Sequence, residues 1–259
     1  MSGSIKSHSI GATMVLTLSN PEHRNALGPE MYAAGVEAIT AADGNPDVRS
    51  IIITGEGAHF CAGGNLQRLL GNRQRPPQVQ ADSIEGLNSW IESVRACSRP
   101  VLAAVEGACA GAGFSLALAC DFLVAAQNSV FVMAYANVGL SPDGGSSWNL
   151  ARSLPRATAM QLLMGGERIG ADRLQQLGMV NRVTEPGQAL AQALALAESL
   201  NAKAPNALAS IKELANDAGA NSLHHHLQQE REHFVRNLHH ANGGEGIQAF
   251  LEKRSPHYR

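Results

Sequence analysis

Three glycine-rich segments, each placed after a short run of residues that favour β-strands, constrain this chain more than any other feature. They are Phe60-Cys-Ala-Gly-Gly-Asn-Leu66, residues 106–121, and Gly139-Leu-Ser-Pro-Asp-Gly-Gly145. Glycine after a strand lets the backbone turn sharply or approach a ligand closely. The second segment also opens a predicted helix, whose first N–H groups lack internal partners and stabilise anions. Two such loops facing each other would form an oxyanion hole from main-chain amides.

The hydrophobic pattern predicts an α/β portion followed by a helical portion. Strands are expected at residues 14–18, 49–54, 101–105, 121–125 and 130–133, and helices at about residues 29–42, 84–94 and 113–119. Residues 71–82 hold Gly71, Pro76 and Pro77 without periodicity, which predicts a mobile loop. After about residue 155 the pattern is almost wholly helical. The run at residues 49–54 is continuously apolar, which is typical of a strand buried on both faces.

Charge and hydrophobicity exclude several classes of protein. The chain has 20 Lys and Arg against 22 Asp and Glu, so its charge gives no basic surface for nucleic acid. The longest apolar run without a charge, residues 107–120, is too short to span a bilayer. The first eight residues, from Met1 to His8, contain no apolar signal region, so we expect a cytoplasmic location.

Cysteine and histidine positions predict neither disulfides nor a metal site. Cys61, Cys97, Cys109 and Cys120 form no CxxC pair, which indicates buried thiols in a reducing compartment. Consecutive histidines, at residues 224–226 and 239–240, would point in different directions on a helix, and no acid or cysteine completes a ligand set.

In their order and spacing, the three segments resemble those of the crotonase (enoyl-CoA hydratase/isomerase) superfamily. The resemblance extends from residues 19–27 to the tail at residues 246–256, which is most of the chain. It implies an α/β fold with a spiral core of repeated ββα units over residues 1–200. A helical region over residues 201–259 would serve trimerisation and CoA capping. The implied substrates are acyl-CoA thioesters, with no separate cofactor, and the implied assembly is a homotrimer or a dimer of trimers.

The resemblance also implies which residues hold the substrate. The backbone N–H groups of Gly64 and Ala112 would form an oxyanion hole for a thioester enolate, and both side chains are small enough for close approach. The implied CoA contacts come from Arg24, Ala26, Ala62, Gly63, Asn65, Leu66, Phe250 and Lys253. At Asn65 the chain departs from the family, which usually has aspartate there.

Acid and base groups distinguish the reactions of this superfamily. The hydratases carry two glutamates at the positions of Ser115 and Tyr135, neither of which is an acid at neutral pH, and this argues against efficient hydration. Asp143 stands where related double-bond isomerases, ring-1,2-epoxyphenylacetyl-CoA isomerase among them, carry an acid. One carboxylate suffices for an isomerase, because it removes a proton from one carbon and returns it to another.

We therefore predict an acyl-CoA isomerase in which Asp143 shuttles the proton. Two alternatives remain open. One is an enoyl-CoA hydratase, a lyase of fatty acid or aromatic acid degradation such as phenylacetate catabolism. The other is a non-catalytic acyl-CoA-binding protein with the same fold. The acyl group itself is not predicted by the sequence.

Overall fold

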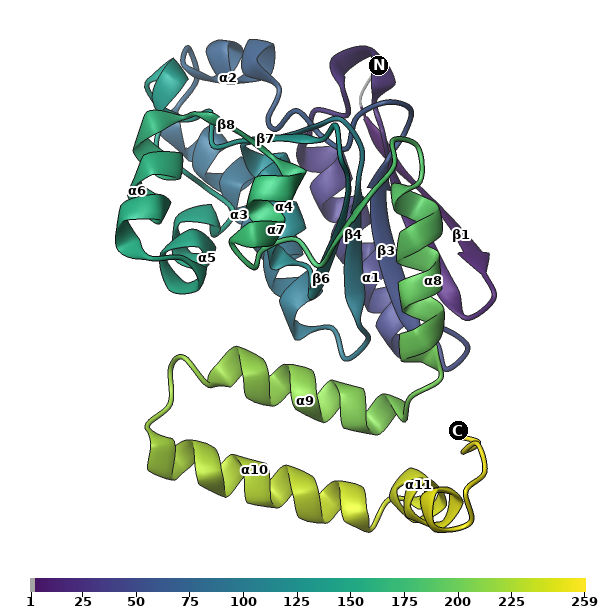
Figure 1. Ribbon diagram of the computed structural model, residues 1–259. Coiled ribbons are helices and arrows are strands. Elements are labelled where there is room, and N and C mark those ends of the chain that lie inside the picture. Colours follow the sequence, from purple (N-terminus) through teal and green to yellow (C-terminus); the bar gives the residue numbers. More distant parts are fainter. Residues whose placement is uncertain (1–2) are drawn as a thin grey trace.

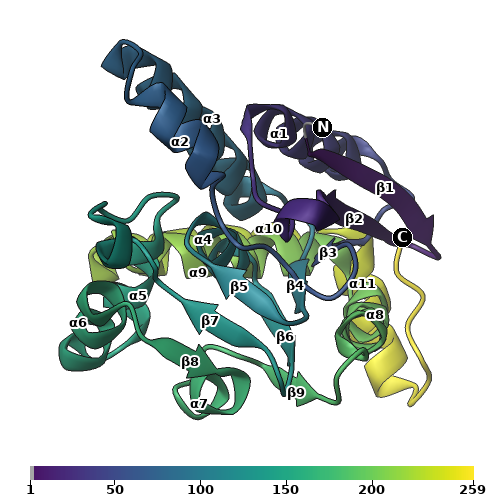
Figure 2. The same ribbon diagram turned by 90° about the horizontal axis from the view of Figure 1, so that it is seen from above.

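Two β-sheets lie side by side and are covered by helices in the computed structural model, which describes residues 3–259 (Figure 1, Figure 2). The larger sheet has the strand order β1-β2-β3-β4-β6-β9 and the smaller sheet has the order β5-β7-β8. The strands are β1 Ser4–Ile10, β2 Thr13–Ser19, β3 Ser50–Gly55, β4 Val101–Val105, β5 Ala108–Ala110, β6 Phe122–Ala126, β7 Val130–Val132, β8 Arg168–Gly170 and β9 Arg182–Thr184.

Helices follow the strands in regular alternation until β9, and only helices come after it. They are α1 Pro29–Gly44, α2 Leu66–Asn72, α3 Pro77–Ala96, α4 Ala112–Ala119, α5 Ser146–Ser153, α6 Arg156–Gly165, α7 Ala171–Gln176, α8 Ala189–Asn201, α9 Pro205–Asp217, α10 Leu223–Leu238 and α11 Ala241–Leu251. Two short 3₁₀ helices, η1 Pro21–His23 and η2 Ala136–Val138, complete the structure.

The chain winds as a spiral whose turns each place a longer strand in the large sheet and a shorter one in the small sheet. β4 and β5 precede α4, and β6 and β7 precede α5. Between β3 and α2 the chain makes two isolated parallel bridges, Cys61 to Cys109 of β5 and Gly64 to Leu27. These successive ββα turns confirm the predicted crotonase-like α/β fold.

Burial on both faces explains why the central strands are so apolar. All five residues of β4 are buried, as are five of the six residues of β3. On one face of the large sheet, Ile52, Leu102 and Val124 pack against α8. The three fully buried residues of α8 are all alanines, so the helix axis can lie close to the strands. Helices α1, α3 and α4 contribute to the larger hydrophobic core on the other face.

The structure corrects two predictions about secondary structure. The predicted mobile loop at residues 71–82 is wrong, because α2 continues to Asn72 and α3 begins at Pro77. Proline at the first position of a helix loses no hydrogen bond, so Pro77 starts the helix and does not break it. The region after residue 155 is almost wholly helical as predicted, but it also contains the short strands β8 and β9, which the prediction did not include. The sequence analysis also missed the largely exposed edge strand β1. The strands and helices that it did predict are present.

Helices α9 and α10 form a layer below the core, and α11 turns away at its end (Figure 1). A partly buried ion pair ties this layer to the core: the Lys212 ammonium of α9 lies 2.8 Å from Asp121, with side chains 10% and 21% exposed. Lys212 also donates to the carbonyl oxygens of Val94 and Arg99. The predicted boundary near residue 200 stays a prediction, although α8 ends at Asn201.

All four cysteine side chains are free thiols; three are buried and Cys120 is half-buried. The prediction of buried thiols without a disulfide is therefore confirmed, except that Cys120 is only partly covered. Within residues 3–259 no helix is both long and apolar enough to cross a membrane. Met1 and Ser2, which belong to the segment examined for a signal region, lie outside the described residues. The cytoplasmic location stays a prediction.

Because α1 packs closely on α3, we predict that one methyl group added at Gly35 lowers the stability of the protein. A Cβ atom at Gly35 would lie 2.2 Å from Cε2 of Trp90, a fully buried side chain. We expect Gly35→Ala to lower the free energy of unfolding by about 1–3 kcal/mol. Gly44 ends the same helix and its added Cβ would meet nothing within 4 Å. Gly44→Ala should leave stability unchanged or raise it by up to about 1 kcal/mol. Urea unfolding of both variants checks this, and equal stabilities would contradict it.

Candidate active site

A short stretch of parallel backbone pairing joins the first two glycine-rich loops. The N–H of Cys61 donates to the carbonyl of Ala108 at 3.0 Å, and the N–H of Ala110 donates to the carbonyl of Cys61 at 2.9 Å. The two loops belong to successive turns of the spiral, so this pairing holds together segments that are almost fifty residues apart in sequence. The facing loops predicted from the glycine pattern are therefore present.

Glycine is required at this junction because the two backbones approach so closely. Gly63 has φ +98°, and a Cβ atom there would lie 2.8 Å from the carbonyl oxygen of Ala110. A Cβ atom at Gly113, on α4, would lie 2.6 Å from Sγ of Cys61. That sulfur in turn accepts a hydrogen bond from the N–H of Gly63 at 3.3 Å. A side chain at either glycine would push the loops apart.

The amides of Gly64 and Ala112 stand on the two sides of this junction. A Cβ atom at Gly63 would lie 3.5 Å from the nitrogen of Ala112, which places the two loops in direct contact. Ala112 is the first residue of α4, where N–H groups lack partners from the preceding turn. Among the hydrogen bonds of residues 3–259, neither the Gly64 nor the Ala112 N–H is a donor. Both amides are available to an oxygen atom brought between the loops.

Residues 24–27, in the segment where the family resemblance begins, pair with the backbone around Gly63 and Gly64. The N–H of Ala62 donates to the carbonyl of Arg24 at 2.9 Å, and the N–H of Leu27 donates to that of Gly63 at 2.8 Å. This pairing brings Arg24, with its exposed side chain, and the buried Ala26 next to Ala62, Gly63 and Gly64.

Asn25 is a structural residue that the sequence analysis missed. Its side chain is fully buried, and its Nδ2 donates to the carbonyl oxygens of Glu56 and His59. Its Oδ1 accepts from the N–H of Asn20 at 2.9 Å. Asparagine tolerates the left-handed backbone, here φ 57°, better than most residues. The sequence feature that could have indicated this role is that Asn25 begins Asn-Ala-Leu, within the segment where the family resemblance starts.

Asn65 and Leu66 begin α2 directly after the Gly64 amide. The Oδ1 atom of Asn65 accepts a hydrogen bond from the N–H of Arg68 at 3.0 Å, so this side chain caps the helix. Asparagine performs this role as well as the aspartate that is usual in the family. Leu66 is 59% exposed, one position beyond the cap.

Asp143, Tyr135 and Ser115 form one hydrogen-bonded group beside the second loop. Tyr135 Oη donates to Asp143 Oδ1 at 2.6 Å. Ser115 Oγ lies 3.3 Å from Tyr135 Oη, 3.0 Å from the carbonyl oxygen of Asp143 and 3.2 Å from that of Gly111. Gly111 immediately precedes Ala112. The candidate carboxylate is thus linked through two hydroxyl groups to the loop that carries one of the two free amides.

Burial dominates the electrostatics of this group. It raises the pKa of the Asp143 carboxyl above its usual value, while the hydrogen bond from Tyr135 acts in the opposite direction. Burial and the neighbouring Asp143 charge raise the pKa of Tyr135 well above its usual value, so the phenol keeps its proton at neutral pH. The arrangement therefore holds one carboxylate and two neutral hydroxyl groups.

Gly144 and Gly145 provide the sharp turn that returns the chain from Asp143 to α5. Both glycines have positive φ, +57° and +75°. A Cβ atom at Gly144 would lie 2.9 Å from Cβ of Ser115 and 3.3 Å from Cδ2 of Leu87. The third glycine-rich loop is thus pressed against α4 and α3, and this contact places Asp143 at the site.

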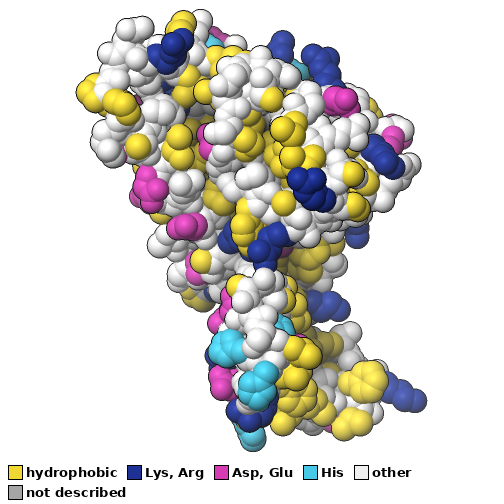
Figure 3. Space-filling view, turned by 90° about the vertical axis from the view of Figure 1, so that its left-hand side faces the viewer, with side chains coloured by type: hydrophobic (Ala, Val, Ile, Leu, Met, Phe, Trp, Pro, Cys, Tyr) yellow, Lys and Arg dark blue, Asp and Glu magenta, His cyan; other side chains and the backbone are white. Residues whose placement is uncertain are grey.

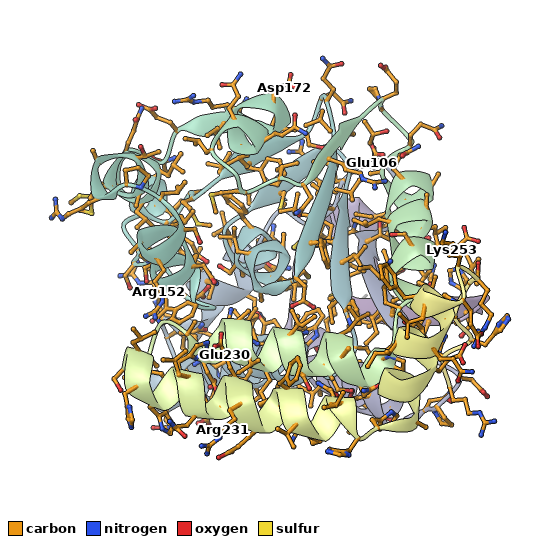
Figure 4. All side chains as sticks on the ribbon, turned by 60° about the horizontal axis from the view of Figure 1, so that its bottom comes forward. Glu106, Arg152, Asp172, Glu230, Arg231 and Lys253 are labelled. Atoms are coloured by element: carbon orange, nitrogen blue, oxygen red, sulfur yellow. The ribbon has the colours of Figure 1, made fainter. Side chains whose placement is uncertain are left out.

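Phe250 and Lys253 are not brought to this site within one chain. Phe250 is 84% exposed, and Lys253 has φ 56° just beyond the end of α11. Figures 1 and 2 place α11 at the opposite end of the molecule from α2, and Figure 4 shows Lys253 on the side where α8 lies. Phe250 and Lys253 could therefore make the predicted contacts only with a CoA bound at the site of another subunit.

The consecutive histidines have ordinary structural surroundings. Nε2 of His226 lies 3.8 Å from Glu230, one turn along α10, and Nδ1 of His240 accepts the N–H of Asn242 at the start of α11. In the part of the chain that the structure describes, no group of three or more His, Cys, Asp or Glu side chains is placed to hold a metal ion.

Comparisons with known proteins agree with this geometry. A sequence model of the family described as enoyl-CoA hydratase/isomerase matches residues 9–259. The chain is 34% identical to the 1,2-epoxyphenylacetyl-CoA isomerase of Escherichia coli K12, over 98% of this chain and 97% of that protein. It is 32% identical to the enoyl-CoA hydratase EchA19 of Mycobacterium tuberculosis, over 96% and 94% of the two chains.

Among solved structures, the crystal structure of an enoyl-CoA hydratase from Polaromonas sp. JS666 matches with a TM-score of 0.98 and 69% identity. The match covers 99% of this chain and 100% of the other. The shared spiral, the two facing loops and matches over nearly the full length lead to one conclusion: the chain belongs to the enoyl-CoA hydratase/isomerase family.

Proposed function

We propose that this member of the family is an acyl-CoA isomerase in which Asp143 carries the proton. One observation supports this most strongly: Asp143 is the single carboxylate in the hydrogen-bonded group beside the free amides. Its neighbours Ser115 and Tyr135 are neutral and occupy the positions that hold glutamates in the hydratases of the family. A hydratase needs groups that both activate water and protonate carbon, whereas an isomerase needs one group that does both transfers.

The proposed reaction uses the chain's groups in two steps. The thioester oxygen accepts hydrogen bonds from the amides of Gly64 and Ala112, which stabilise the negative charge of an enolate. Asp143 takes a proton from one carbon, and the electron pair of that C–H bond moves into the conjugated enolate. The resulting carboxylic acid returns the proton to the other end of the conjugated system, so the double bond moves and the net charge is unchanged. The acyl-CoA thioester is the substrate, and no separate cofactor takes part.

Burial makes Asp143 better suited to this task than an exposed aspartate. A raised pKa means a stronger base, and it also means that the acid formed after proton abstraction is less prone to lose its proton to water. The side chain must be ionised to begin the reaction. Isomerase activity should therefore rise with pH through the pKa of Asp143.

The names of the relatives leave hydration as the alternative. The Escherichia coli relative is named as an isomerase, and the 69% identical structure is titled as a hydratase. In that alternative, Asp143 or another group would activate water. The non-catalytic alternative would keep binding of acyl-CoA without turnover.

Replacing Asp143 by asparagine tests the proton shuttle. The substitution keeps the shape of the side chain and removes the base, so we expect isomerase kcat to fall by at least about 100-fold. Binding of the acyl-CoA should change little, since the amides of Gly64 and Ala112 are untouched. Turnover is followed by mass-resolved products from 3-enoyl-CoA, and binding by calorimetry. Near-normal turnover by Asp143→Asn would reject the shuttle.

Hydration of a straight-chain 2-enoyl-CoA separates the two enzyme classes. Because Ser115 and Tyr135 replace two acids, we expect hydration by the wild-type protein to be slower than isomerisation by about 100-fold or more. A panel of 2-enoyl-, 3-enoyl- and aryl-derived CoA thioesters, with products resolved by mass, gives both rates from one preparation. Hydration that equals or exceeds isomerisation would favour the hydratase.

We also propose that the lower helices bind a second copy of this chain, as the family resemblance implies. Large exposed hydrophobic side chains gather there, and Figure 3 shows them over the lower part of the molecule. On α10 and α11 they are Leu223, Leu227, Phe234, Val235, Leu238, Ile247, Phe250 and Leu251. A groove of about 580 Å³ runs between α9 and α10, and Figure 4 shows Glu230 and Arg231 on α10, two of the residues that line it. An apolar surface of this extent is typical of a protein interface.

A charge at the centre of this surface should weaken the assembly. Phe234 is 69% exposed on α10, and we expect Phe234→Glu to shift the protein toward monomers at micromolar concentration. His225 is also exposed on α10, half a turn away from the direction of Phe234, so His225→Glu serves as the matched control. Light scattering after size exclusion gives the masses. A wild-type monomer, or equal masses for both variants and the wild type, would contradict the proposal.

A further inference from the structure

Counting protons in the group around Asp143 assigns the direction of each hydrogen bond. An ionised carboxylate only accepts, so the single proton of Tyr135 Oη is committed to Oδ1 of Asp143 at 2.6 Å. The single proton of Ser115 has two carbonyl acceptors, at 3.0 Å and 3.2 Å, on Asp143 and Gly111. The phenol of Tyr135 therefore has one defined donor direction, toward Asp143, while Ser115 donates to one of the two carbonyl oxygens.

The two oxygens of Asp143 differ as a result. Oδ1 is occupied by a short hydrogen bond from a phenol that is itself only 8% exposed. Within residues 3–259 no other side chain donates a hydrogen bond to the Asp143 carboxylate, so none reaches Oδ2. A carboxylate held at one oxygen by a fixed donor loses freedom to rotate, so the second oxygen keeps a constant direction.

We propose that Tyr135 is a positioning residue which holds Oδ1 of Asp143 and leaves Oδ2 as the one oxygen that carries the proton. This inference rests on the proposed isomerase function and extends it. When the α C–H bond breaks, its proton forms the O–H bond on Oδ2 and its electron pair enters the enolate. The same O–H bond then breaks as a C–H bond forms at the γ carbon, with no change in oxidation state.

A single fixed oxygen limits the substrates that the site would accept. The two carbons that exchange the proton must both lie within reach of Oδ2, on the same face of the enolate. The α and γ carbons of a 2-enoyl or 3-enoyl thioester are two bonds apart and meet this condition. A shift of the double bond over a longer distance would require the carboxylate to swing, which the bond from Tyr135 opposes.

The pH dependence of the reaction reports on this bond. The hydrogen bond from Tyr135 favours the ionised form of Asp143, and burial opposes it, so loss of the phenol hydroxyl should raise the pKa of Asp143. Tyr32 of α1 also senses the charge of Asp143, and it lies next to Arg68 of α2 and near Cys61. Burial raises the pKa values of both Tyr32 and Cys61 to about 12, so of these three groups Asp143 is the one that titrates in the acidic range.

Tyr135→Phe is the direct test, with Tyr32→Phe as its matched control. Both are buried tyrosines, but only Tyr135 donates a hydrogen bond to Asp143. For Tyr135→Phe we expect kcat to fall by about tenfold, KM to change by less than about twofold, and the acidic limb of the kcat profile to move up by about one pH unit. Tyr32→Phe should keep the wild-type pH profile.

The second measurement follows the proton itself. With substrate deuterated at the donor carbon, we expect the wild type to deliver a larger share of deuterium to the acceptor carbon than Tyr135→Phe does, because a freely rotating carboxyl exchanges its proton with water more readily. If Tyr135→Phe does not fold, 3-fluorotyrosine at position 135 keeps the ring and gives a stronger donor, so the acidic limb should then move down.

The outcomes distinguish this inference from the proposed function. A wild-type acidic limb in Tyr135→Phe, or in the fluorotyrosine protein, would overturn the role of Tyr135 whatever happens to kcat. If Asp143→Asn keeps its turnover, the shuttle itself fails and Tyr135 has no carboxylate base to position. If Asp143→Asn is inactive and the acidic limb of the kcat profile moves up in Tyr135→Phe, both the proton shuttle and the positioning role of Tyr135 are supported.

Discussion

The site depends on the backbone hydrogen bonds between Cys61 and the strand that begins at Ala108. These bonds join two turns of the spiral and so fix the Gly64 loop against the first residue of α4. Neither loop alone could surround an oxygen atom with two amides. Because the two loops pack so closely, there is no room for a side chain at Gly63 or Gly113. In the proposed reaction, the side chain that moves the proton comes from the third loop.

Within this scaffold the choice of reaction rests on very few atoms. Ser115 and Tyr135 direct their hydroxyl groups toward the Asp143 turn. An enzyme that must place a water molecule needs room and two charged partners. Here the phenol of Tyr135 occupies one carboxylate oxygen, and the contact of Gly144 with Ser115 brings the turn close to α4. One fold can host different reactions, so the chemistry has to be argued from these side chains and not from the fold.

Sequence patterns predicted those parts of the structure that depend on local backbone chemistry. The glycine-rich loops and the apolar run at residues 49–54 have unambiguous physical causes, and both are present. The helix at Pro77 was missed because proline and glycine signals do not distinguish a loop from a helix start. The Tyr135–Asp143 bond was not foreseen, because it depends on η2 and on the left-handed turn at Gly139, which fold eight residues back on themselves. No local pattern shows the placement of α11 far from α2.

Asp121 serves two separate parts of the molecule with one carboxylate oxygen. Its Oδ2 accepts the N–H of Val101, the first residue of β4, and also the ammonium of Lys212 on α9. β4 leads within a few residues to Ala108, which pairs with Cys61. One carboxylate oxygen therefore connects the lower helices directly to the first residue of the strand that leads to the second glycine-rich loop, so a loss of Asp121 would free both at once.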